Sequence, residues 1–203
     1  YQALNASTTA SNNTAIGHST LKYLTTANNC TAVGYEALNN NTSSSNTAVG
    51  YAASKYNSSG TRNVSVGYKS LEDNTTASDN TGIGYFALNK NTTGASNTAL
   101  GCFALHLNQT GNYNTAVGCY ALTDNTASNN TAVGYEALTD NTTGNYNTAV
   151  GYYALKTCDT GYGNTALGYY SLYAVTTGNS NCAIGQASGD AITTGSQNIS
   201  MGY

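Results

Sequence analysis

The sequence predicts an all-β fold, a parallel β-solenoid (β-roll or β-helix) of about twelve coils, each 16 or 17 residues long. Three observations predict it: a glycine column that recurs at this period, a strand-like phrase before each glycine, and turn-forming residues between the phrases. The glycines are Gly17, Gly34, Gly50, Gly67, Gly84, Gly101, Gly118, Gly134, Gly151, Gly168, Gly185 and Gly202. Such a repeat indicates stacked units that bury their apolar residues against their neighbours.

Each coil is predicted to contain one strand over a phrase such as Thr148-Ala149-Val150. The phrase alternates with period two and has β-branched residues at its ends, which is typical of a strand. A helix pair would need a longer period, because helical repeats exceed about 30 residues. Strand spacing of ~4.8 Å per coil predicts a rod roughly 55–60 Å long.

Two columns are predicted to form the core. The residue before each glycine is always aliphatic or Met, which suggests that it is buried in every coil. The Thr column two residues earlier has the same strand parity, so we expect it to point inward as well. The second core column is Leu four residues after the glycine, replaced in two coils by Ser54 and Gly189.

The turns are predicted from Asn, Ser, Thr and Gly, which crowd stretches such as residues 141–145. Asn also stands four residues before every glycine except one, where Cys30 replaces it. A stacked Asn column can satisfy its amides along the ladder, so we interpret this column as structural.

The composition excludes several function classes. Only 7% of residues are charged and the net charge is −3, so we expect no nucleic-acid partner. No run of about 18 apolar residues is present, so no membrane insertion is expected. His18 and His106 are far apart, and Asp124 and Asp140 are only two neighbouring carboxylates. We therefore expect no enzyme activity, no metal site and no cofactor.

Residues 1–203 read as a single repeat array without atypical capping repeats. We therefore expect a segment of a longer fibre or coils that stack end to end. Two large aliphatics per coil are few for a closed single-chain prism. The alternatives are such a prism or a flat roll whose core is completed by other chains, for which a homotrimer is a natural solution.

The phrase Asn-Thr-Ala-Val-Gly, with variants at residues 13–17 and 63–67, resembles the Asn-Ser-Val-Ala-Ile-Gly repeat of trimeric autotransporter adhesin heads. The fuller phrase Asn-Thr-Ala-Val-Gly-Tyr-x-Ala-Leu resembles arrays in bacteriophage tail-fibre proteins. This resemblance covers all twelve repeats and implies left-handed β-rolls in trimers, serving as rigid heads or shafts on a cell or virion surface. The longer coil and the Tyr and Leu columns depart from the adhesin pattern.

A tyrosine column follows the glycines and is the first candidate functional feature. It includes Tyr35, Tyr51, Tyr68, Tyr85, Tyr135, Tyr152 and Tyr169, with Tyr1 and Tyr203 at the two ends. Stacked rings could be platforms for surface glycans, or they could be a stabilising ladder or a chain interface. His18, Cys102, Cys119 and Gln186 replace Tyr in this column, which argues against a site that needs every coil.

A second candidate feature is a row of Asn-x-Ser/Thr sequons in one turn. Its possible glycosylation sites are Asn41, Asn57, Asn74, Asn91, Asn108 and Asn141. They would give the rod a row of glycans if the chain were secreted by a glycosylating route. The alternative is that Asn-Thr is simply good turn chemistry, copied with the repeat.

The cysteines suggest one disulfide. Cys102 and Cys119 occupy the same column on adjacent coils, so their Cα atoms should lie within disulfide range, although the parallel geometry is strained. Cys30, Cys158 and Cys182 lie in three other columns, and we interpret them as replacements of small buried or turn residues.

Three function classes follow. The first is a non-enzymatic structural and adhesive segment of an extracellular fibre. The second is a self-assembling extracellular filament whose sequons could carry N-linked glycans. The third is an ice- or crystal-binding solenoid, suggested by the Thr column, although inward-pointing threonines would disfavour it.

Overall fold

The phrase before each glycine forms a three-residue strand in the computed structural model, which describes all 203 residues. The strands are β1 Thr14–Ile16, β2 Thr31–Val33, β3 Thr47–Val49, β4 Val64–Val66, β5 Thr81–Ile83, β6 Thr98–Leu100, β7 Thr115–Val117, β8 Thr131–Val133, β9 Thr148–Val150, β10 Thr165–Leu167, β11 Cys182–Ile184 and β12 Ile199–Met201. The predicted parallel β-solenoid is confirmed, and each coil contributes one strand.

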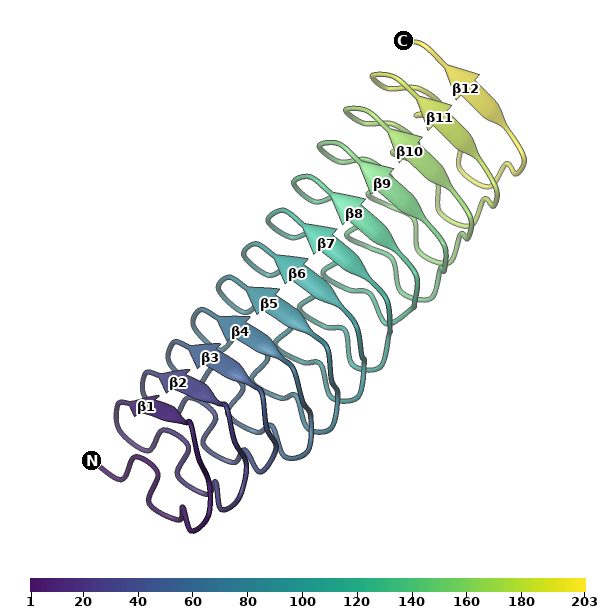
Figure 1. Ribbon diagram of the computed structural model, residues 1–203. Coiled ribbons are helices and arrows are strands. Elements are labelled where there is room, and N and C mark those ends of the chain that lie inside the picture. The colour runs from purple at the N-terminus through teal and green to yellow at the C-terminus, as the bar shows by residue number, and fades with distance from the viewer.

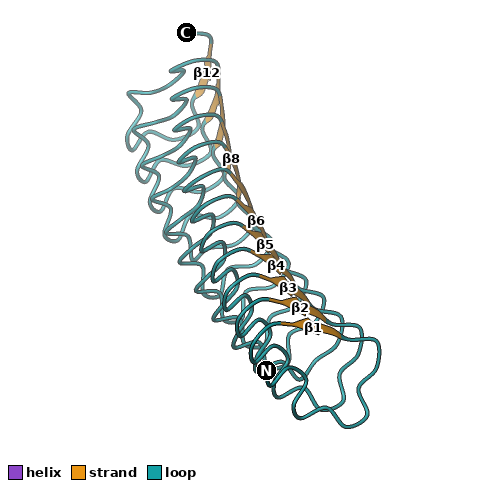
Figure 2. Cartoon of the chain, turned by 90° about the vertical axis from the view of Figure 1, so that its left-hand side faces the viewer, coloured by secondary structure: helices purple, strands orange, loops and turns teal.

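The strands form one parallel sheet in sequence order from β1 to β12. Pairing is in register, so Ala99 lies beside Ala116 and Leu100 beside Val117. The rod is elongated with its termini at opposite ends (Figure 1). Figure 2 shows that the strands follow one side of the rod, whereas loops and turns make the remainder of each coil. The chain has no helix, and therefore none that could span a membrane.

The central residue of each strand points to the inside of the coil. It is usually Ala, and it is buried in most strands. The prediction that the aliphatic column before the glycine is buried was therefore wrong. Seven of its side chains are 37–74% exposed, namely Ile16, Val49, Ile83, Leu100, Leu167, Ile184 and Met201. The Thr column was predicted inward for the same reason, and it also faces outward. The prediction that the Thr and aliphatic columns share one face of the strand was correct. That face is the outer one, however, and not the inner one.

The interior is too narrow for the larger side chains of the strand. A Cβ at Gly82, a central strand position, would lie 2.8 Å from Ser70 Oγ and 3.3 Å from Leu71 Cδ1. Because the opposite wall approaches this closely, only Ala, Ser or Gly fits on the inner side of the sheet. Val and Thr must then face outward.

The second predicted core column is confirmed. Nine Leu side chains at the fourth position after the glycine are fully buried, as Leu105 and Leu122 illustrate. Their backbone φ angles lie near +50°, so this wall is a series of left-handed turns instead of a second strand. With Ala, Leu and Asn filling each coil, the interior closes within one chain, without side chains from other copies.

The core is interrupted once, where a serine replaces Leu. Ser54 and Ser65 are both buried, and their hydroxyls are 2.8 Å apart. The apolar side chains form one cluster before this pair and a larger one after it. The neighbouring coils place Leu38 and Leu71 at the position of Ser54, and Ala48 and Gly82 at the position of Ser65.

Replacing the pair by Ser54→Leu together with Ser65→Ala is expected to join the clusters and to raise the free energy of unfolding by about 1–2 kcal/mol. Urea denaturation of both proteins at equal chain concentration measures this change. Ser65→Ala alone is the control. It removes the partner of the Ser54 hydroxyl and should destabilise the protein, and equal stability of both variants would contradict the account.

A first Asn ladder closes each turn onto the sheet. These are the Asn residues four before the glycines, and their Nδ2 groups donate to turn carbonyls, as Asn97 does to Gly111 at 2.8 Å. Each Oδ1 accepts the backbone N–H of the next rung, as Asn97 Oδ1 does from Asn114 at 2.9 Å. The predicted structural ladder is confirmed, with the backbone as the main partner.

A second Asn ladder lies seven residues after the glycines and runs from Asn41 to Asn141. Each Nδ2 donates to the Oδ1 of the preceding rung over 2.6–3.4 Å. The ladder therefore points in one direction. It ends at Asn141 because the next rung is Cys158, and Asn141 Oδ1 is the one buried side-chain oxygen without a donor.

Candidate functional site

The outward side of the sheet is a continuous surface that we call the strand face. It consists of the first and third residues of strands β1–β12, which are mostly Thr and Val, Ile or Leu. All of these side chains are half-buried or exposed. No Asp, Glu, Lys or Arg occurs among them, so the strand face is an uncharged stripe of methyl and hydroxyl groups along the rod.

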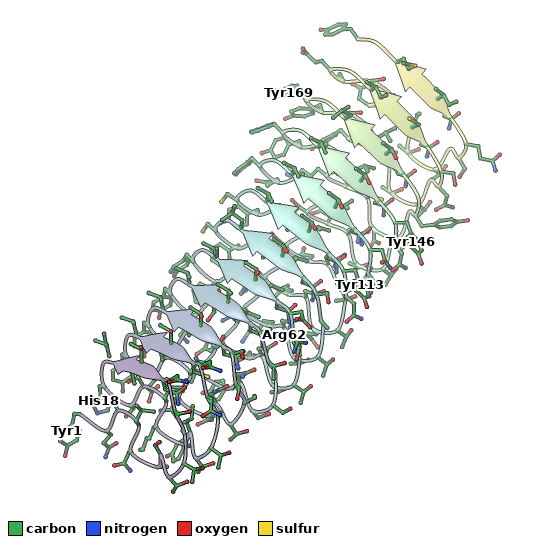
Figure 3. All side chains as sticks on the ribbon, in the orientation of Figure 1. Tyr1, His18, Arg62, Tyr113, Tyr146 and Tyr169 are labelled. Atoms are coloured by element: carbon green, nitrogen blue, oxygen red, sulfur yellow. The ribbon has the colours of Figure 1, made fainter.

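An aromatic stripe borders the strand face, because the chain bends at each glycine directly after the strand. Its rings stack from coil to coil, with centroids 5.2 Å apart for Tyr35–Tyr51 and Tyr51–Tyr68. His18 stacks between Tyr1 and Tyr35 instead of interrupting the column. The whole stripe comprises Tyr1, His18, Tyr35, Tyr51, Tyr68, Tyr85, Phe86, Phe103, Tyr120, Tyr135, Tyr152 and Tyr169. Figure 3 shows Tyr1, His18 and Tyr169 along one edge of the rod.

The stripe changes column where Cys102 and Cys119 replace Tyr. Phe86, Phe103 and Tyr120, one residue further along their coils, carry the stacking past the cysteines, at 5.5 and 5.3 Å. Tyr120 then meets Tyr135 edge to face at 6.4 Å, and stacking resumes between Tyr135 and Tyr152 at 5.3 Å. This detour was not predicted, although the aromatic residues at the second position after the glycine could have indicated it.

Cys102 and Cys119 are free thiols, so the structure does not contain the predicted disulfide. Both are half-buried on adjacent coils. Burial raises the pKa of the Cys119 thiol, and the neighbouring Cys102 thiol raises it further. The remaining cysteines have no cysteine neighbour. Cys158 is buried among core side chains, which raises its pKa to about 12.

A tyrosine cluster near the C-terminal end was also missed. Tyr152, Tyr153, Tyr169, Tyr170 and Tyr173 contact one another on consecutive coils, with centroids 4.2 Å apart for Tyr152–Tyr153. The tandem pairs Tyr152-Tyr153 and Tyr169-Tyr170 are the signal that could have revealed it. Lys156 Nζ lies 4.4 Å from the Tyr153 ring centroid, which is a cation–π contact.

Ion pairs border the stripe and neutralise most of the cations. Lys156 contacts Glu136 at 2.6 Å and Lys55 contacts Glu36 at 2.7 Å. Glu136 also accepts a hydrogen bond from Tyr135, which raises the pKa of that phenol to about 12. These pairs leave no strongly charged patch next to the strand face.

The opposite edge of the rod carries single exposed side chains instead of a stack. Tyr113 and Tyr146 point outward there, as does Arg62 (Figure 3). Arg62 pairs with Asp79 of the next coil, with Nε 2.6 Å from Oδ1. This edge has no continuous aromatic surface.

The predicted row of glycans is incompatible with this fold. Asn41, Asn57, Asn74, Asn91, Asn108 and Asn141 are the second Asn ladder, and all are fully buried. Each Nδ2, the atom that a glycan would modify, donates hydrogen bonds inside the coil. The sequons arise because Ser or Thr follows a buried structural Asn in the turn.

The surface carries no pocket and no cluster of metal-ligating side chains (His, Cys, Asp or Glu) larger than a pair. Asp140 lies beside Asp124, and its pKa is raised chiefly by burial and partly lowered by Lys156. The candidate functional site is therefore an extended surface, the strand face with the aromatic stripe.

Comparison with known proteins adds no relative. No family model matches the chain, and searches of curated proteins and of solved structures also gave no match.

Proposed function

We propose that this chain is a non-enzymatic structural and adhesive segment of an extracellular fibre, and that its strand face packs against further copies of the same chain. The observation that carries the proposal is the exposed aliphatic column. It places an apolar side chain at the end of each of the twelve strands. A contiguous apolar stripe of this length is typical of an interaction surface.

A second copy is the partner whose spacing fits best. Both surfaces would have the same coil spacing, so Val or Ile of one copy would meet the same column of the other along the full length. The absence of charge on the strand face permits this burial without desolvating an ion. Three strand faces around a threefold axis would form a homotrimer, which is also the assembly implied by the resemblance to adhesin heads and phage tail fibres.

Adhesion is assigned to the aromatic stripe and the tyrosine cluster. Tyr rings are half apolar and end in a hydroxyl, which suits them to the faces of surface sugars. Rings that are mostly 5.2–5.5 Å apart offer many similar weak contacts, and such contacts add up through effective concentration. A cell surface or virion surface is the location that this role requires.

Light scattering after size-exclusion chromatography tests the assembly. The chain mass is 20.9 kDa, and three chains per particle are expected. Val117→Lys with Val150→Lys places two cations on the strand face and is expected to yield single chains. Thr110→Lys with Thr143→Lys adds the same charge at exposed turn positions and should leave the mass unchanged. Single chains in the unmodified protein would refute the proposal, and unbounded filaments would favour the end-to-end alternative.

A second candidate function is binding to ice or to another crystal surface. It is favoured by the outward orientation of the Thr column, which removes the objection that these threonines point into the core. Thermal hysteresis in concentrated single-chain protein tests it. Freezing-point depression that disappears in the variant with Val117→Lys and Val150→Lys would support this candidate, and its absence would remove it.

A further inference from the structure

Two free thiols lie on adjacent coils inside a frame of aromatic rings. Cys102 and Cys119 follow the paired glycines of coils that contain β6 and β7. Backbone hydrogen bonds from Gly118 N to Leu100 O at 2.8 Å and from Tyr120 N to Cys102 O at 2.9 Å fix their register. The two side chains therefore leave the backbone side by side.

The aromatic frame is the detour of the stripe. Phe103 and Tyr120 stack beside the two cysteines with centroids 5.3 Å apart. Tyr85 on the preceding coil meets Phe103 edge to face at 5.5 Å, and Tyr135 on the following coil meets Tyr120 at 6.4 Å. The thiols thus replace tyrosine at two successive positions of the column, beside the stacked rings of Phe103 and Tyr120.

The geometry favours a bridging ion over a direct S–S bond. Neighbouring parallel strands hold equivalent atoms about 4.8 Å apart, whereas a disulfide needs Cβ atoms about 3.8 Å apart and a dihedral near 90°. An ion with metal–sulfur bonds of about 2.3 Å, the length known for zinc thiolates, spans such a gap when it lies between the two sulfurs.

The number of donors then selects the ion. Zinc requires four ligands in a structural site, and no third His, Cys, Asp or Glu joins the two thiols. Hard cations prefer oxygen ligands. Thiolates select soft ions, of which Cu(I) is the physiological example. We infer that Cys102 and Cys119 together bind one soft monovalent cation of the Cu(I) type.

Binding releases protons and involves no redox change. Two thiols lose two protons and form two Cu–S bonds, so the product is a Cu(I) bis-thiolate with one net negative charge. Both sulfurs come from one chain, so one ion per chain is expected whether the protein is single or trimeric. The site is independent of the proposed fibre function.

Anaerobic titration of the reduced 203-residue chain with Cu(I), in competition with a chromogenic Cu(I) chelator, tests the inference. One equivalent per chain is expected, accompanied by ultraviolet thiolate-to-copper charge-transfer absorption. Two thiols on one scaffold should hold the ion about 100-fold or more tightly than one thiol does. Cys182→Ser is the matched control, because Cys182 is half-buried and its neighbours in register are Thr165 and Ile199.

The decisive variant is Cys102→Tyr with Cys119→Tyr, which restores the residue found at this position in most other coils. It should keep the circular dichroism spectrum and lose the copper. The single variants Cys102→Tyr and Cys119→Tyr each retain one of the two thiols. Copper binding that survives the double variant, or wild-type binding no tighter than that of either single variant, would overturn the inference. Zn(II) binding of equal stoichiometry and strength would also overturn the assignment to a two-coordinate soft ion.

Discussion

Gly118→Ala is expected to destabilise the protein by at least about 3 kcal/mol, because the added methyl group causes both backbone strain and a steric clash. Gly118 has φ of +141°, a conformation that L residues rarely adopt. The added Cβ would also overlap the carbonyl oxygen of Gly134 on the next coil. That oxygen belongs to the stacked backbone, so it cannot move without disturbing the neighbouring coils.

Gly163→Ala separates the two penalties. Gly163 has φ of +67°, but the nearest atom to an added Cβ is 3.7 Å away. This substitution should cost about 1 kcal/mol, the price of a left-handed conformation alone. Urea denaturation of both variants at the same chain concentration provides the comparison. Similar losses for the two would show that close backbone stacking does not account for the glycine column.

Asn74→Ala is expected to cost about 2–4 kcal/mol, because it breaks the second Asn ladder in its middle. Asn74 Nδ2 donates to Asn57 Oδ1 at 2.7 Å and to Ala77 O at 3.0 Å. Its Oδ1 accepts from Asn91 Nδ2 at 2.9 Å. Removing the amide leaves these groups buried with fewer partners and also leaves a cavity.

Asn40→Ala is the control for the ladder. Asn40 also belongs to a sequon, but its side chain is only half-buried and makes no hydrogen bond within the chain. Its loss should change the free energy of unfolding by no more than about 0.5 kcal/mol. Thermal melts followed by circular dichroism report both variants. Equal melting temperatures for the Asn74 variant and the unmodified protein would contradict the structural role of the ladder.

The repeat made the architecture predictable from the sequence. The glycine period placed all twelve strands, the Leu column was assigned correctly to the interior, and the Asn column before the glycines was interpreted correctly as a structural ladder. The two faces of the strand were exchanged because an aliphatic column was taken as a sign of burial. Ala149 and Val150 are both apolar, so alternation alone could not say which faces inward. The width of the interior decides, and that width depends on how closely the Leu wall approaches.

The candidate surface was less predictable for a related reason. The Tyr column was found, but a search of one column could not show that Phe103 and Tyr120 continue the stack around Cys102. The prediction of a glycan row failed because the Asn-x-Ser/Thr pattern specifies only the local sequence. It does not indicate whether the Asn amide is buried. Left-handed φ angles at Leu and at other non-glycine residues have no sequence signal, so the turn-built wall opposite the sheet could not be anticipated.

Sequential stacking also determines how the rod would respond to tension. Each coil is bonded mainly to the coils directly before and after it, through hydrogen bonds about one repeat apart in sequence. A pull on the two ends of the chain would load these contacts so that an end coil is stripped before an inner one. Each coil of 17 residues could then release up to about 55–60 Å of extended chain. A fibre built in this way would dissipate sudden force in many small steps, while its inner coils stay folded.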